Sequence, residues 1–172
     1  MLDGKPEGNT STAFGRPSPT LMGIAVYDRL DRQPPVEPQF RQIMWRRREL
    51  ENYLCTRETL LSFTGAKGQE QEGEMFGGSW RAVMDETIKE IESALAALGK
   101  PSPWGPDLKA SDDFLDPLFR KFYEKLGLPN LMRKTDYHTL APFVPAAALD
   151  DEIRETLDLI AQTADQARPR RD

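Results

Sequence analysis

Residues 21–54 read LMGIAVYDRLDRQPPVEPQFRQIMWRRRELENYL, and this stretch decides which fold the chain can take. Residues 21–27 are an apolar run of strand length, which is typical of a strand buried on both faces. The three prolines within residues 29–39 predict a loop, and residues 40–45 predict a second strand. Because an isolated strand pair is only marginally stable, either helices are expected to pack against it in a small α+β unit or the other strands of its sheet lie elsewhere.

Outward from this stretch, the spacing of apolar residues predicts four or five helices. The first is expected from Arg46 to Phe63, and the Gly- and Glu-rich residues 64–78 are expected to form a loop. Ser79 is expected to cap the next helix, which Gly99 ends.

The second half of the chain continues the helical pattern. Asp116 is expected to cap the helix that follows, with Pro117 in its first turn, and Gly127 to end it. A short helix over about 134–141 and a last helix over about 149–166 complete the prediction. The expected fold class is therefore α+β and mostly helical, with a short two-strand parallel element.

The predicted domain organisation is simple. Residues 1–20 are rich in Gly and Pro and are expected to be a disordered lead-in. Residues 21–166 are expected to form a single domain, and residues 167–172 a polar tail.

Composition narrows the function classes. The chain has 172 residues and a net charge of −5, and this balance does not favour non-specific binding to nucleic acid. With one cysteine and one histidine, it cannot supply a zinc site, so a metal would need oxygen ligands. It lacks an apolar run of bilayer length and a signal-peptide pattern, so a cytoplasmic location without a membrane partner is expected.

Charged residues follow each predicted strand. Asp28 and Asp31 come after the first, where two carboxylates can hold a divalent cation such as magnesium, although aspartates are also common in turns. Arg46, Arg47 and Arg48 follow the second strand, and their planar guanidinium groups can contact phosphates of a nucleic acid.

Three further residues are candidates for chemistry. Glu49 and Glu51 are two positions apart on a predicted helix, so at most one is expected to face a site at Asp28. Both can instead simply favour the first turn of a helix. Lys134 can neutralise a phosphate or a developing charge, or be a solvated surface group. His138 is expected to be structural or exposed.

These segments together resemble a known family. The strand running into DRLDR, the run WRRRELENYL and the run MRKTDYHTLA followed by LDDEIRETLDLI are similar to the carboxy-terminal half of OLD-type and related AAA (ABC-like) ATPases. There, an ATPase domain is followed by a TOPRIM-like nuclease domain. The resemblance spans roughly residues 21–165. It implies a TOPRIM-like sheet, magnesium as cofactor and DNA as substrate.

By this resemblance, Asp28 and Asp31 are the metal ligands, and Glu49, Glu51 and Lys134 are the catalytic residues. Two departures matter. Leu30 stands where the family has a second motif aspartate, and the upstream residues predict no strand with a catalytic glutamate. No GxxxxGK[ST] phosphate loop occurs either. The chain is therefore expected to be a carboxy-terminal fragment of an ATPase-linked nuclease. It would act as an interaction or remnant domain beside an ATPase partner chain. The alternative is a magnesium-dependent DNA endonuclease module.

Overall fold

The computed structural model describes residues 22–32, 40–73 and 77–167. The predicted lead-in over residues 1–20 and most of the predicted tail lie outside these residues. In chain order the elements are β1 (Gly23–Tyr27), β2 (Phe40–Met44), α1 (Glu51–Leu54), α2 (Arg57–Glu72), α3 (Gly77–Ala97), the π-helix η1 (Ala110–Leu115), α4 (Asp116–Lys125), the 3-10 helices η2 (Lys134–Phe143) and η3 (Ala146–Ala148), and α5 (Asp151–Gln166).

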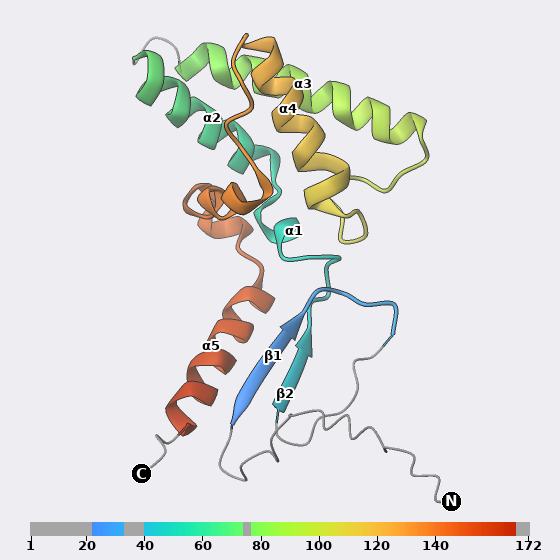
Figure 1. Cartoon of the computed structure of the whole chain (residues 1–172), viewed down its shortest axis with the longest axis vertical. Helices are drawn as coiled ribbons and strands as arrows, with labels where there is room; N and C mark the ends of the chain where they lie inside the picture. The colour runs from blue at the N-terminus through green and yellow to red at the C-terminus, as the bar shows by residue number, and fades with distance from the viewer. Residues whose placement is uncertain (1–21, 33–39, 74–76, 168–172) are drawn as a thin grey trace, which may run out of the picture.

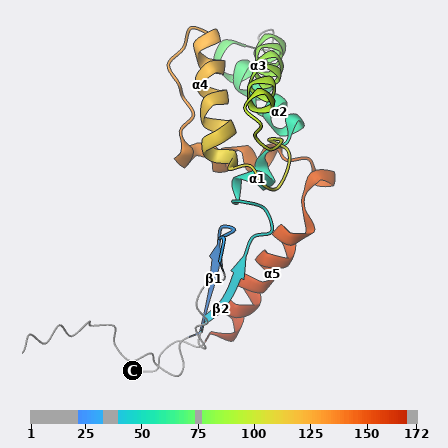
Figure 2. The same cartoon turned by 90° about the vertical axis from the view of Figure 1, so that its right-hand side faces the viewer.

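The elements are arranged in two levels along the long axis of the molecule. Helices α2, α3 and α4 form a helical body at one end, and the sheet lies at the other end with α5 beside β1 (Figure 1). Figure 2, turned by 90°, shows the same two levels joined through α1. The predicted α+β, mostly helical class is confirmed.

The sheet described here is a pair of parallel strands, as predicted. Gly23 lies opposite Phe40 and Tyr27 opposite Met44. A side chain at Gly23 would put its Cβ 2.6 Å from Cδ1 of Phe40, so that ring would have to move for a larger residue to fit. Every residue of β1 is only partly buried, so the prediction that this strand is buried on both faces is wrong for the described chain.

The hydrophobic core lies in the helical body. Helix α2 packs along α3, and α4 packs on α3. Phe63 meets Phe119 edge to face, and Trp80 meets Phe122 in the same way. The largest fully buried side chains are Trp80, Tyr137, Phe114, Phe119, Phe122, Leu60, Met84, Ile88, Leu108, Leu115, Leu118 and Leu140.

The predicted helix from Arg46 to Phe63 is wrong over residues 46–50 and is interrupted at residues 55–56, between α1 and α2. The backbone N–H of Arg48 donates to the carbonyl of Pro106 at 2.7 Å, so residues 46–50 follow a bent path held by a distant loop. A new helix then starts after Thr56, whose side chain accepts a hydrogen bond from the backbone N–H of Thr59. This side chain is an N-cap that the apolar spacing did not reveal.

The predicted loop over residues 64–78 is also wrong, because α2 continues to Glu72 and α3 begins at Gly77. One glycine here serves packing. A Cβ at Gly77 would lie 2.8 Å from the backbone oxygen of Gly65, so the lack of a side chain at Gly77 lets α2 and α3 approach closely. Composition alone suggested a flexible segment, but close helix packing needs the same small residues.

Helix ends were predicted with mixed success. Gly99 and Gly127 end α3 and α4 with positive φ angles of 66° and 69°, as expected. Ser79 lies inside α3 and does not cap it. Asp116 is the first residue of α4 and no cap, because its backbone N–H bonds to the carbonyl of Ser111 in the preceding π-helix.

Candidate functional site

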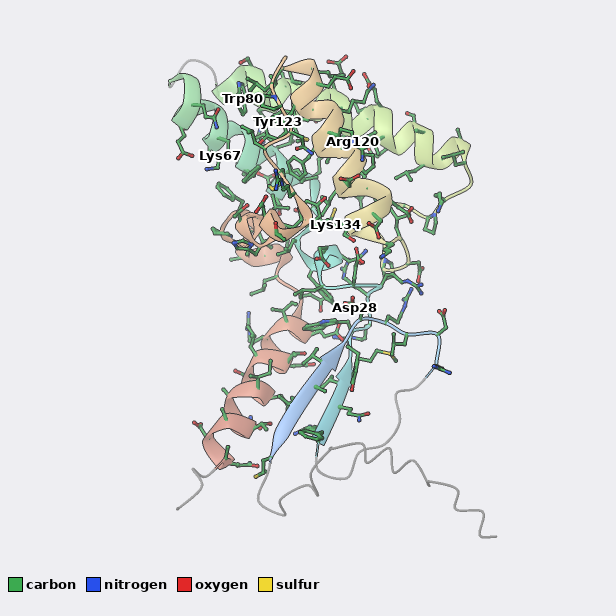
Figure 3. The ribbon with its side chains drawn as sticks, viewed as in Figure 1. Asp28, Lys67, Trp80, Arg120, Tyr123 and Lys134 are labelled. Carbon is green, nitrogen blue, oxygen red and sulfur yellow. The ribbon has the colours of Figure 1, made fainter. Side chains whose placement is uncertain are left out.

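The carboxyl end of β1 and the segment after β2 lie side by side. The backbone N–H of Trp45 donates to the carbonyl of Tyr27, and the N–H of Arg29 donates to the carbonyl of Arg48, both at 3.0 Å. Asp28 is therefore held beside the RRRELEN segment, as the parallel arrangement of the strands predicts. Its side chain is exposed, and Figure 3 labels it at the end of β1.

The carboxyl group of Glu51 has a raised pKa, and charges at this edge of the sheet contribute to the shift. Burial raises the pKa of its carboxyl group, and the nearby charges of Glu49 and Asp28 raise it further, whereas Lys134 lowers it. The charges of Asp28, Glu49 and Lys134 therefore all act on the half-buried carboxylate of Glu51. Lys134, labelled in Figure 3, forms an ion pair with Asp112.

Glu49 has a different environment. Its side chain is buried and accepts a hydrogen bond from the backbone N–H of Ser111. Its own N–H donates to Oδ1 of Asn52 at 3.0 Å, and the amide of Asn52 donates to the carbonyls of Gly105 and Leu108. Glu49 and Asn52 therefore tie α1 to the loop before η1. That at most one of the two glutamates faces Asp28 stays a prediction from their spacing.

The guanidinium groups predicted to contact phosphates are engaged inside the chain. Arg46 lies 3.1 Å from Glu152 and 3.7 Å from Asp150, and Arg47 lies 3.6 Å from Asp150. The hydrogen bond and charge of Glu152 raise the pKa of Arg46. The guanidinium of Arg47 also stands 5.1 Å from the ring centre of Tyr53. These arginines hold the start of α5 against the segment after β2.

The third arginine engages the aspartate turn. Arg48 lies 3.2 Å from Oδ1 of Asp31, and Arg29 donates at 2.7 Å to Asp107 and at 3.0 Å to the carbonyl of Arg46. Asp31 is exposed, so its ion pair contributes little to stability. Each of the three predicted phosphate contacts therefore has a carboxylate partner that a phosphate would have to replace.

The residues can be tested against the magnesium ion that the resemblance implies. Within residues 22–32, 40–73 and 77–167, no three or more His, Cys, Asp or Glu side chains gather closely enough to hold a metal ion. Magnesium commonly binds through one or two protein carboxylates, with water and phosphate completing its shell. Asp28 can supply one such ligand, whereas Asp31 is paired with Arg48.

Sequence reasoning missed a pocket between α1, η2 and the start of α5. Its volume is about 380 Å³. Its lining is mainly apolar, with Glu51 and Lys134 among the polar members; it consists of Leu50, Glu51, Tyr53, Leu54, Lys134, Thr135, Tyr137, His138, Ala141, Val144, Leu149 and Ile153. The side chain of His138 is exposed, as expected, and its Nδ1 lies 2.8 Å from the carbonyl oxygen of Thr135.

Comparisons with known proteins identify no relative of this chain. The chain matches no family model, and searches of curated proteins and of solved structures find no match either. Within the described residues, no helix combines the length and apolarity needed to cross a membrane.

Proposed function

We propose that this chain is a non-catalytic interaction domain of an ATPase-linked nuclease, docking on a partner chain through α5 and the adjoining sheet. The observation that carries this proposal is the orientation of α5. Ile153, Leu157, Ile160 and Ala164 share one face of the helix at helical spacing. We call these four residues the α5 stripe.

Helix α5 places polar side chains inward and much of its stripe outward. Glu152 and Thr156 are buried, whereas Leu157 is 60% exposed and Ile160 is 37% exposed. An amphipathic helix in a self-sufficient domain buries its apolar side, and an exposed apolar patch is a common mark of an interface. The stripe is therefore best explained by a partner that covers it.

The sheet supports the same proposal. Its described part consists of β1 and β2 alone, paired with each other, and two strands rarely form a stable sheet without further strands or extensive packing. A partner that lies against α5 and the strands would bury both features. The resemblance of the sequence to the carboxy-terminal half of OLD-type ATPases suggests an ATPase chain as that partner.

The first experiment measures exposed apolar surface and self-association of the full chain. Native protein should bind the dye anilinonaphthalene sulfonate, and the double substitution L157D/I160D should remove most of that binding. Leu98→Asp is the matched control, because Leu98 is 75% exposed at the far end of α3. A folded chain that binds no dye and sediments as a monomer would argue against an uncovered interface.

A magnesium-dependent DNA endonuclease is the second candidate. The observation that favours it is the electrostatic coupling of Asp28, Glu49 and Lys134 with Glu51 at the carboxyl edge of β1. We expect purified chain to leave plasmid DNA intact in magnesium or manganese. Cleavage that Asp28→Ala abolishes and Asp158→Ala preserves would overturn the non-catalytic proposal.

A further inference from the structure

We propose that the pocket between α1, η2 and α5 anchors an apolar side chain of a basic amphipathic helix, and that a cation of this helix pairs with Glu51. The partner helix would then continue along the α5 stripe. This inference rests on the proposed interaction function and specifies its partner by chemistry. Its apolar anchors, Leu50, Leu149 and the α5 stripe, are residues that the resemblance does not assign.

The first support is the continuity of the apolar surface. Ile153 lines the pocket and begins the α5 stripe, so the two features share this residue. Leu50 and Leu149 line the same pocket, yet they are 45% and 40% exposed. Apolar anchors spaced along one face of a helix fit a pocket that opens onto such a stripe.

The second support is charge. Glu51 lies in the pocket lining, and the charges of Glu49 and Asp28 are close enough to raise its pKa. The cation in this lining, Lys134, is already paired with Asp112. A partner that brings a positive charge to Glu51 therefore meets an acidic environment.

Helix α5 extends this acidic character. Residues 151–166 contain five carboxylates and a single arginine. Within the described chain, no cation lies within ion-pair distance of Asp151, Glu155 or Asp158, and all three are exposed. Long lysine or arginine side chains of a partner helix can reach such carboxylates while their aliphatic parts cover the stripe. The charge pattern favours a basic helix over an acidic helix or a second copy of this acidic chain.

The experiment uses two synthetic helical peptides with identical leucine positions at helical spacing. One carries lysines on its polar face and the other glutamates. Binding to the full chain is followed by fluorescence anisotropy at low salt. The lysine peptide should bind at least about tenfold more tightly than the glutamate peptide, and added salt should reduce the difference.

Variants of the chain then locate the peptide. Leu149→Asp and, independently, Leu50→Asp should each weaken binding of the lysine peptide by about tenfold, as expected for loss of a buried anchor. Both residues are partly exposed, so both variants should fold, which circular dichroism checks. Leu98→Asp is the control for the added charge and should leave binding unchanged.

The charge at Glu51 has its own control. Glu51→Gln should weaken the lysine peptide about threefold and leave the glutamate peptide no weaker, because a partly exposed ion pair is worth little. Glu124→Gln, an exposed glutamate of α4, should change neither. Equal affinities for the two peptides, or equal effects of Leu149→Asp and Leu98→Asp, would overturn the inference.

The result also separates this inference from the proposed function. If the lysine peptide does not bind while L157D/I160D still removes dye binding, the proposed interaction surface is supported. The inference that its partner is a basic helix is then wrong. If wild-type chain dimerises and Leu149→Asp prevents it, a second copy occupies the pocket and the inference is wrong. If the chain binds neither the lysine peptide nor the dye, the proposed interaction surface is contradicted as well.

Discussion

The hydroxyl group of Tyr53 donates a hydrogen bond to Oε2 of Glu152, which joins α1 to α5 across 99 positions of the sequence. The other oxygen of Glu152 accepts the backbone N–H of Arg46 at 2.9 Å. Asp150 caps α5 by accepting the N–H of Glu152. One buried carboxylate thus fixes the helix that carries the proposed interface to the segment that follows β2.

Removing this hydroxyl should loosen α5. Tyr53→Phe deletes a hydrogen bond to a charged acceptor, and such bonds contribute about 1.5–3 kcal/mol. We expect the free energy of unfolding in urea to fall by about that amount, and amide hydrogens of α5 to exchange faster. Unchanged stability together with unchanged exchange in α5 would contradict a clamping role for Tyr53.

The second buried tyrosine provides a contrast. Tyr137 is also buried, but its hydroxyl has no hydrogen-bond partner in the described residues. Tyr137→Phe removes an unsatisfied polar group, so the free energy of unfolding should stay constant or rise. Measured beside Tyr53→Phe in the same urea titration, a loss of equal size would show that the Tyr137 hydroxyl has a partner after all.

Alkaline pH should destabilise the chain partly through Tyr53. Burial and the hydrogen bond to Glu152 raise the pKa of Tyr53 from 10.0 to about 12. The neutral phenol is therefore favoured in the folded state, so its contribution is complete below pH 10.0 and is lost as the pH rises to about 12. Thermal melts across this window should show a steeper decline for wild type than for Tyr53→Phe. Parallel declines would rule out Tyr53 as a source.

The coupling at the sheet edge predicts a directional change in a single pKa. The charge of Asp28 contributes to the raised pKa of Glu51. Asp28→Asn should therefore lower the pKa of Glu51, which carboxyl chemical shifts measured by NMR against pH can follow. Asp31→Asn is the control, because that carboxylate faces Arg48. If both variants change the pKa of Glu51 equally, Asp28 has no special electrostatic coupling to Glu51, and the prediction is wrong.

The helical body should dominate stability. Leu60 is fully buried in the core, and Leu60→Ala should reduce the free energy of unfolding by about 2–5 kcal/mol. Leu98→Ala at an exposed position should change it by less than about 0.5 kcal/mol. Chemical denaturation of both variants tests where the core lies, and similar losses would contradict the described burial.

Several features could be predicted from the sequence because their causes are local. The apolar run at residues 23–27 predicts a strand, and the structure has one there. The loop predicted from the prolines lies largely in residues 33–39, outside the described residues. Gly99 and Gly127 end helices because glycine adopts positive φ without strain. The proximity of Asp28 to the RRRELEN segment follows from two parallel strands that end at the same edge.

The remaining features depend on contacts between distant parts of the chain. The bend after Trp45 is held by the bond from Arg48 to Pro106, so helical spacing over residues 46–63 could not reveal it. Gly77 suggests a loop in the sequence, but in the structure its missing side chain leaves room for the backbone of Gly65 where α2 and α3 pack together.

The sequence by itself determined the strand pair, the glycines that end α3 and α4, and the identity of the charged residues. Only the tertiary structure decided what those charges meet. Arg46 is paired with Glu152 and Arg48 with Asp31, where the sequence suggested phosphate contacts. The tertiary structure also decided that much of the α5 stripe, including Leu157 and Ile160, is exposed. The physical reason is that periodicity and turn chemistry act over a few residues, whereas ion pairs and burial depend on which distant surfaces the fold brings together.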